Sequence, residues 1–119
     1  MATHNELGKK GEQLAIDYLL KKGYTILERN YRYLKAEVDI IAQKETLLAV
    51  VEVKTRSSDV FGNPQDFVNS KKIKLLVSAI DYFVVEKNLD VEVRFDIIAI
   101  LRKKNDFVIE HLEDAFLHF

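Results

Sequence analysis

The feature that most constrains the fold of this chain is an aliphatic run over residues 47–54, Leu-Leu-Ala-Val-Val-Glu-Val-Lys, which ends in charged residues. A run of this kind predicts a strand that is central in a sheet and covered on both faces. Because side chains alternate along a strand, Glu52 and Lys54 are expected on the same side as Leu48 and Val50. Charged groups at the end of a buried strand are costly unless they are paired, hydrated or bound to a metal. The run therefore predicts both the centre of a sheet and a site at one of its ends.

Further helices and strands are predicted around this strand. Apolar residues at helical spacing indicate a first helix that ends before Gly23, a favourable C-cap. The expected elements are a helix over 6–22, a strand over 24–33, a hairpin of strands 37–42 and 47–54 with its turn at 43–46, a loop over 57–64, a helix over 65–86, and strands over 91–101 and 107–112 that flank a turn at 102–106. This α-β-β-β-α-β-β order predicts an α/β fold with a mixed β-sheet flanked by helices.

Composition limits the class of protein. With 119 residues, of which 48% are hydrophobic, the sequence predicts one domain over residues 1–119. The absence of cysteine excludes disulfides and cysteine-based zinc sites. No apolar run approaches the roughly 20 residues of a membrane-spanning helix, so a cytoplasmic protein without membrane contact is expected. The net charge of −1 argues mildly against a nucleic-acid binder, although a metal site must itself be acidic.

A second acidic segment precedes the aliphatic run. In Glu37-Val38-Asp39-Ile40-Ile41, alternation predicts both acids on one face and the aliphatic Val38 and Ile40 on the other. If the two strands pair, Asp39 lies near Glu52 at the same end of the sheet. Two carboxylates with nearby carbonyl oxygens make an all-oxygen site suited to Mg²⁺ or Mn²⁺. A neighbouring lysine can then orient the attacking water or stabilise charge in the transition state.

Ordinary structural interpretations compete with this one. Asp and Glu-x-Lys at loose spacing occur by chance, and a salt-bridge ladder on an edge strand has the same pattern. The aliphatic strand favours the site, since a solvated ladder belongs on a strand of alternating polarity. Glu12, in the first helix, faces either solvent or the end of the sheet, and solvated helix glutamates are the commoner case. Basic residues that can contact phosphate are Arg56, Lys71, Lys72, Lys74 and the 102–104 turn, although such residues are commonplace on solvated surfaces. No role is assigned to the three histidines, which are His4, His111 and His118.

On these residues the chain resembles the YraN-like family of small bacterial proteins, regarded as predicted endonucleases of the restriction-endonuclease-like superfamily and distantly similar to archaeal Holliday-junction resolvases. The matching stretches are Gly11-Glu12 with Ala15, Gly23-Tyr24, Arg29-Asn30-Tyr31-Arg32, Glu37-Val38-Asp39-Ile40-Ile41, Val51-Glu52-Val53-Lys54-Thr55-Arg56, Phe61-Gly62-Asn63-Pro64, Lys71 with Lys74-Leu75, Arg94-Phe95-Asp96 and Ala115-Phe116. They cover nearly the whole chain in order, and the Glu-Val-Lys-Thr-Arg block is the most specific. One departure is Ala36, where the family usually has glycine before Glu-x-Asp.

The resemblance implies a restriction-endonuclease-like fold with a metal site at one end of the sheet. By position it implies that Asp39 and Glu52 are metal ligands, with the Val53 carbonyl as a third ligand, and that Mg²⁺ or Mn²⁺ is the cofactor. It implies that Lys54 serves the attacking water and that Glu12 is an accessory catalytic acid. It implies that Arg56 and Lys71 contact substrate phosphate. Lys74, near the start of the second helix, is expected to bind nucleic acid together with them.

Three functions follow as hypotheses. The first is a Mg²⁺-dependent endonuclease that hydrolyses phosphodiester bonds in DNA, including branched or structured DNA, for which a homodimer would suit symmetric cutting. The second is a non-catalytic module that binds nucleic acid or a protein on a nuclease fold, which the near-neutral charge favours. The third is a structural protein in which Glu52 and Lys54 form an ordinary ion pair. Intact acids together with the lysine favour the first hypothesis.

Overall fold

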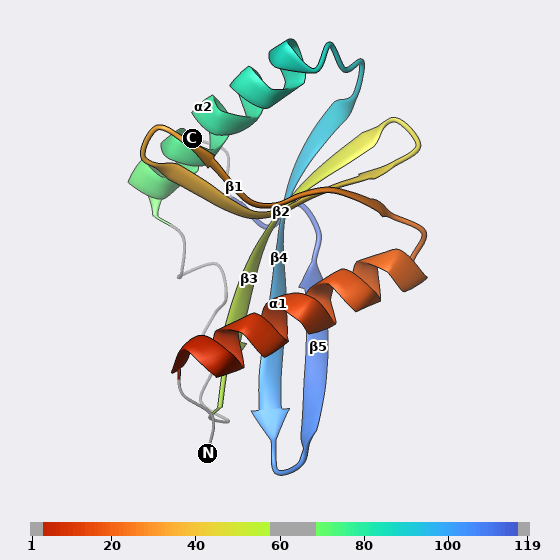
Figure 1. The fold of residues 1–119 in the computed structure, drawn as a ribbon, viewed down its shortest axis with the longest axis vertical. Helices are drawn as coiled ribbons and strands as arrows, with labels where there is room; N and C mark the ends of the chain where they lie inside the picture. The colour runs from red at the N-terminus through yellow and green to blue at the C-terminus, as the bar shows by residue number, and fades with distance from the viewer. Residues whose placement is uncertain (1–3, 58–68, 117–119) are drawn as a thin grey trace.

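Seven regular elements form the protein, and a computed structural model describes them over residues 4–57 and 69–116 (Figure 1). They are α1 (His4–Lys21), β1 (Thr25–Tyr33), β2 (Ala36–Lys44), β3 (Leu47–Arg56), α2 (Ser70–Glu86), β4 (Glu92–Lys103) and β5 (Asp106–Leu112). The predicted α-β-β-β-α-β-β order is confirmed. No helix in the described ranges has the length and apolar character needed to cross a membrane.

The five strands form one sheet in the order β1-β2-β3-β4-β5. Neighbouring strands are antiparallel except β3 and β4, which run parallel and are connected through α2. The predicted central strand is therefore confirmed: β3 lies in the middle of the sheet, and its residues 48–53 are buried. The sheet is mixed, as the element order predicts.

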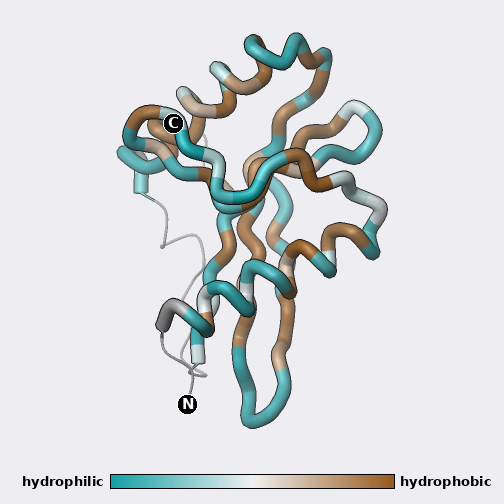
Figure 2. Tube along the Cα trace, viewed as in Figure 1, coloured by the Kyte–Doolittle hydropathy of each residue, from teal (hydrophilic) through white to brown (hydrophobic). Residues whose placement is uncertain are grey.

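The helices cover opposite faces of this sheet, so the protein has two hydrophobic cores. On one face, Ala15, Ile16 and Leu19 of α1 pack with the odd-numbered residues of β3. On the other face, α2 packs with Leu48 and Val50, the even-numbered side of the same strand. Figure 2 shows hydrophobic residues along the middle of the sheet, whereas the β4–β5 turn is hydrophilic. Glu52 and Lys54 consequently belong to the α2 side of β3, as alternation predicts.

The end of α1 is fixed by Gly23, as predicted. Gly23 has a φ of +95°, which a residue without a Cβ adopts at little cost. The backbone N–H of Tyr24 donates to the carbonyl of Leu19, and the N–H of Gly23 donates to the carbonyl of Leu20. These two bonds form a Schellman motif, which satisfies the last carbonyls of the helix.

Helix α2 begins later than predicted. The sequence pattern predicts its start at Gln65, but Asn69 has an extended backbone and acts as the N-cap, and its side chain accepts a hydrogen bond from the Lys72 backbone N–H at 2.8 Å. Asparagine is a preferred N-cap because its side chain satisfies an otherwise unpaired N–H of the first turn. The predicted helical residues 65–68, Val68 among them, and residues 58–64 of the predicted loop lie outside the described residues.

The three hairpin turns are tighter than the sequence suggests. Strand pairing extends to Lys44 with Leu47 and to Lys103 with Asp106, so only residues 45–46 and 104–105 remain in two of the turns. The β1–β2 turn likewise consists of residues 34–35. The first residue of each turn has a positive φ, in the left-handed region. These residues are Leu34 (54°), Glu45 (54°) and Lys104 (53°).

Candidate active site

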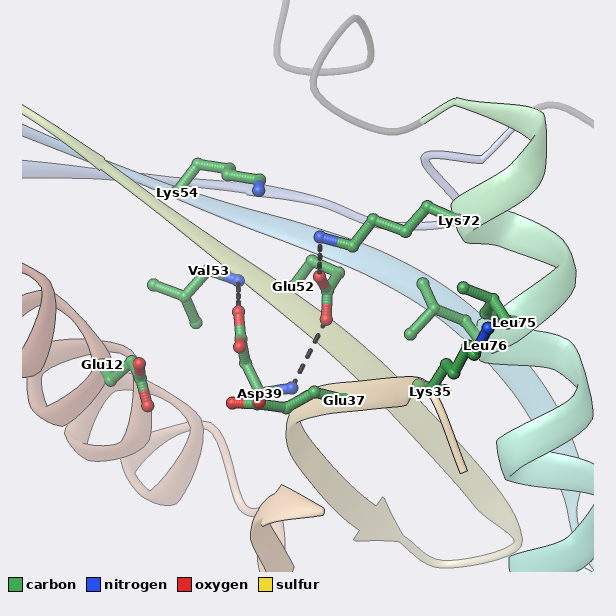
Figure 3. A pocket seen from close by; sticks show the side chains of 11 residues that line it. Glu12, Lys35, Glu37, Asp39, Glu52, Val53, Lys54, Lys72, Leu75 and Leu76 are labelled. Atoms are coloured by element: carbon green, nitrogen blue, oxygen red, sulfur yellow. Dashed lines mark hydrogen bonds and ion pairs between the residues drawn. The ribbon is translucent and has the colours of Figure 1, made fainter. Parts of the chain in front are cut away.

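The candidate site lies where β2 separates from β3. Their backbone pairing ends at Ile40 with Val51, and side chains continue the contact beyond that point. The Asp39 carboxylate oxygen Oδ2 accepts a hydrogen bond from the Val53 backbone N–H at 2.8 Å. In return, the Asp39 N–H donates to Glu52 Oε2 at 3.4 Å (Figure 3). The two acids that the sequence analysis places at one end of the sheet are therefore brought together.

The route by which Asp39 reaches this position differs from the prediction. Regular alternation predicts Val38 and Ile40 on the same face, and this is wrong: Val38 packs in the α2-side core and Ile40 in the α1-side core. Alternation therefore slips by one residue at Asp39, where the backbone ladder to β3 ends. Sequence periodicity alone assumes an uninterrupted ladder, so it cannot locate such a break.

Glu52 is buried, with a side-chain exposure of 2%, and its counter-charge comes from α2. Lys72, in the first turn of that helix, places its Nζ 2.8 Å from Glu52 Oε1. By sequence, Lys72 is one of several basic residues that can contact phosphate, and nothing in the sequence pattern connects it with Glu52. The sequence does indicate that the buried Glu52 requires a cation nearby, but sequence alone does not show which of the lysines supplies it.

Lys54 projects from the same side of β3 toward Lys72, as Figure 3 shows. Partial burial and the neighbouring Lys72 ammonium lower the pKa of Lys54, and together these effects exceed the opposing attraction of Glu52 and Asp39. For Lys72, burial lowers the pKa, but the hydrogen bond and charge of Glu52 outweigh it, so the net direction is upward. The two ammonium groups are therefore different: Lys72 is held charged by Glu52, whereas Lys54 loses its proton more readily.

The pKa values of the two acids nearest α1 also shift. Burial, followed by repulsion from the Glu52 carboxylate, raises the pKa of Asp39 to about 6. Burial and then the charge of Asp39 raise the pKa of Glu12. Glu12 also lines the same cleft as Asp39, so it faces the site and not bulk solvent alone. Perturbed acids and bases that converge in a cleft are typical of functional sites.

A close approach between α1 and β3 brings Glu12 to this cleft. The preceding residue, Gly11, is buried, and a Cβ added to it would overlap Thr55 Oγ1 and lie 3.0 Å from Thr55 Cβ. At Gly11 the helix thus packs against the end of β3 so closely that a side chain would overlap Thr55. Because Gly11 lies within a helix, glycine is required there by the lack of space for a Cβ and not by an unusual φ.

These groups line a cleft of about 490 Å³ between α1, α2 and the ends of β2 and β3 (Figure 3). Its lining is Glu12, Lys35, Ala36, Glu37, Asp39, Glu52, Val53, Lys54, Lys72, Leu75 and Leu76. All five residues that were expected to act as catalytic groups or ligands are among them. The three expected phosphate contacts are not: Arg56, Lys71 and Lys74 are exposed and lie outside the lining.

Metal-binding capacity can be judged from the donors. Among the described residues, no group of three or more histidine, aspartate and glutamate side chains is arranged to hold an ion. Asp39 and Glu52 supply two carboxylates, so a bound ion would need further oxygen ligands from backbone, water or substrate. Such a donor set fits Mg²⁺ or Mn²⁺, which retain waters and bind through one or two carboxylates.

A second polar cluster lies around His111, a residue to which the sequence pattern assigns no role. Asp96, which is fully buried, accepts hydrogen bonds from the Arg94 side chain and from the Asp114 backbone N–H, and lies 2.8 Å from His111 Nε2. On its other side, His111 Nδ1 lies 3.2 Å from the hydroxyl of Tyr18 in α1. Tyr18 and His111 are 93 positions apart, so no local pattern could have revealed this cluster. Its hydrogen bonds join elements from both ends of the chain.

The fold and the cleft together define a class. A mixed five-stranded sheet is covered by two helices and carries acids and lysines at the end of its central strand, which defines an α/β protein with a charged cleft at that end. The chain belongs to the uncharacterised protein family UPF0102, whose family model matches residues 11–100. This is the YraN-like family, so the resemblance noted in the sequence is confirmed.

Relatives match over the full length. The protein is 60% identical over 119 residues to "UPF0102 protein FP2501" of Flavobacterium psychrophilum, covering 100% of both chains. It is 47% identical over 116 residues to a UPF0102 protein of Phocaeicola vulgatus, covering 98% of this chain and 96% of the relative. A solved structure of Pyrococcus furiosus SfsA in complex with Ca²⁺ is 14% identical, covers 94% of this chain and 64% of that one, and has a TM-score of 0.34, which is too low to support any argument.

Proposed function

We propose that this protein is a divalent-cation-dependent endonuclease that hydrolyses phosphodiester bonds in DNA. The observation that carries the proposal is the convergence of Asp39, Glu52 and Lys54 in one cleft at the split between β2 and β3. In this proposal, Asp39, Glu52 and the Val53 carbonyl hold Mg²⁺ or Mn²⁺. When bound, such a cation polarises a phosphoryl oxygen and lowers the pKa of a bound water.

The chain's own residues have distinct roles in this reaction. Lys54, whose pKa is lowered, holds or releases a proton at Nζ and orients the attacking water. Lys72 pairs with the buried Glu52 carboxylate and holds it in position by this contact. Glu12, whose pKa is raised by burial and by Asp39, is the accessory acid on the α1 side. Arg56, Lys71 and Lys74 are exposed near the ends of β3 and α2, and we assign them contacts to the DNA backbone.

A second function is favoured by one observation. The Lys72 ammonium forms an ion pair with Glu52 Oε1, so this lysine balances the charge of the acid without any metal. A domain that binds nucleic acid without cutting it would be served equally well by this arrangement. Cleavage assays distinguish the two functions.

The test uses the purified chain with linear, nicked and four-way DNA in Mg²⁺, in Mn²⁺ and in EDTA. We expect cleavage that requires metal and is lost in Asp39→Asn and in Lys54→Met. Glu110→Gln, which changes an exposed acid of β5 outside the cleft, is the matched control and should cleave normally. Cleavage that survives both cleft substitutions would exclude this site, and binding without cleavage in either metal would favour the second function. Sedimentation of the same samples tests the homodimer proposed for symmetric cutting.

A further inference from the structure

We infer that Leu34, at the tip of the β1–β2 turn, is a wedge that inserts between bases of the DNA received by the neighbouring cleft, and that the protein therefore prefers DNA in which a base step is already unstacked. The inference rests on the proposed function for its DNA ligand and adds a substrate preference to it. Leucine is one of the apolar side chains that proteins insert between base steps.

Exposure is the first observation. Leu34 is 84% exposed, more than any other large hydrophobic residue in the described ranges that lies at the surface. A single exposed leucine needs no explanation by itself, because much of any protein surface is apolar. Its position and backbone conformation distinguish this one.

The backbone conformation gives an internal comparison. All three hairpin turns place their first residue in the left-handed region, where glycine and asparagine are favoured and bulky residues are disfavoured. Two of these turns carry the polar residues Glu45 and Lys104, which suit exposed positions. Only the β1–β2 turn has a large apolar residue there, although it is as exposed as the others. The fold thus keeps an unfavourable residue at this tip, and such outliers are a reason to look for function.

The tip is also next to the cleft. Lys35, the second residue of the turn, lines the cleft together with Ala36 and Glu37, which begin β2. A duplex whose backbone reaches Asp39 and Glu52 therefore passes this turn. By contrast, the β4–β5 turn that contains Lys104 lies at the far end of the molecule (Figure 1).

The turn is anchored as a wedge requires. Tyr33, directly before Leu34, stacks on Tyr82 of α2 with ring centroids 4.4 Å apart. Tyr31 packs edge-on against Phe83 of the same helix, at 5.2 Å. Across the turn, Arg32 forms an ion pair with Glu37 at 2.9 Å. The two aromatic contacts hold the hairpin against α2, and the ion pair links its two strands, so inserting Leu34 orders no flexible loop.

Unstacking a base step costs free energy, and the cost is least where a base is mismatched or the duplex is interrupted. One apolar side chain therefore gives a preference for mismatched, nicked or branched DNA over a continuous duplex. The cations beside the tip, such as Lys35, contribute attraction to phosphate that does not depend on sequence.

The experiment measures binding in EDTA, so that no cleavage is needed, with 2-aminopurine placed beside a mismatch. We expect the wild-type chain to raise 2-aminopurine fluorescence on binding and to bind the mismatched duplex at least about tenfold more tightly than the matched one. Leu34→Asn should abolish the fluorescence change and most of that preference. Its melting temperature should equal or exceed that of the wild type, because asparagine tolerates a positive φ.

Two control variants isolate the wedge. Glu45→Asn makes the same change of backbone preference in the β2–β3 turn, which does not line the cleft, and Val85→Asn removes a different apolar side chain that is 78% exposed. Both should retain the fluorescence change and the mismatch preference. A fluorescence change that persists in Leu34→Asn, or that is absent in the wild type bound to the same DNA, overturns the wedge alone. Failure of the wild type to bind any DNA overturns the proposed function together with the wedge. A dimer that Leu34→Asn dissociates without altering DNA binding assigns the tip to a second copy of the chain and overturns the inference.

Discussion

Asp39 is charged in a place where folding disfavours a charge. Its carboxylate is desolvated and lies beside that of Glu52, and these effects raise its pKa from 3.8 to about 6. A carboxyl group with a raised pKa contributes stability below its unfolded pKa, and this contribution is lost as the pH rises through about 6. At neutral pH the ionised group therefore destabilises the fold, in keeping with a residue retained for function.

Asp39→Asn should therefore stabilise the protein. Asparagine keeps an oxygen that accepts the Val53 N–H but removes the charge. Urea unfolding near neutral pH should show a gain of up to about 3 kcal/mol, since each pKa unit corresponds to about 1.4 kcal/mol. The gain should fall toward zero below about pH 3, where Asp39 is protonated in both states. A variant that is less stable at every pH would mean that the carboxylate is mainly a structural acceptor.

Substitution of Lys72 should have the opposite effect and lower the stability of the protein. Lys72→Met leaves the buried Glu52 without its ammonium partner, so we expect a loss of about 3 kcal/mol in the free energy of unfolding. The double variant Glu52→Gln with Lys72→Met should recover most of that loss, because no charge remains uncompensated. Added Mn²⁺ should stabilise Lys72→Met more than the wild type if the ion takes the place of the ammonium group. Equal stabilisation of both would separate the ion pair from the proposed metal site.

Among the elements, α1 provides an internal control for close packing. Gly11→Ala places a Cβ that overlaps Thr55 Oγ1, so the helix or Thr55 must shift, at a cost of about 1–3 kcal/mol. Gly8→Ala, in the same helix, meets nothing within 4 Å and should stabilise by up to about 1 kcal/mol through helix propensity. Thermal unfolding of both variants checks the difference. Adding Thr55→Ala to Gly11→Ala should restore part of the loss, and equal effects of the two alanines would refute the close contact.

Some features of these helices and strands can be predicted from the sequence, and others cannot. Hydrophobic periodicity predicts the order of helices and strands, because it is a property of neighbouring residues. The centrality of β3 and the proximity of Asp39 and Glu52 follow from one aliphatic run and one hairpin. The slip of alternation at Asp39, the N-cap at Asn69 and the pairing of Lys72 with Glu52 depend on where strands separate and where a helix docks. Those events are decided by tertiary packing, so periodicity does not contain them.

At the scale of the whole molecule, the two buried acid clusters differ in the direction in which the pKa of their aspartate is shifted. Asp96 of β4 connects with β5 through His111, with the C-terminal segment through the Asp114 N–H, and with the start of β1 through Arg94, which donates to the Tyr24 hydroxyl. Through His111 the cluster also reaches Tyr18 of α1. All buried side-chain nitrogen and oxygen atoms in the described residues have a hydrogen-bond partner. A fully satisfied cluster that spans both ends of the chain stabilises the global fold.

Asp96→Asn should accordingly lower global stability, and its pH dependence should be the reverse of that at Asp39. Burial acts to raise the pKa of Asp96, but hydrogen bonds from His111, Arg94 and Asp114 outweigh it, so the pKa lies below 3.8. A carboxyl group with a lowered pKa contributes stability above its unfolded pKa and loses it as the pH falls through the folded one. We expect Asp96→Asn to cost about 3 kcal/mol at neutral pH, because Arg94 loses its buried counter-charge, and to cost progressively less below about pH 4. Urea unfolding of Asp96→Asn and Asp39→Asn over one pH series checks both signs together. If both variants were destabilised in parallel over this pH series, both aspartates would stabilise the fold in the same way. The carboxylate of Asp39 would then not differ from that of Asp96 in its effect on stability.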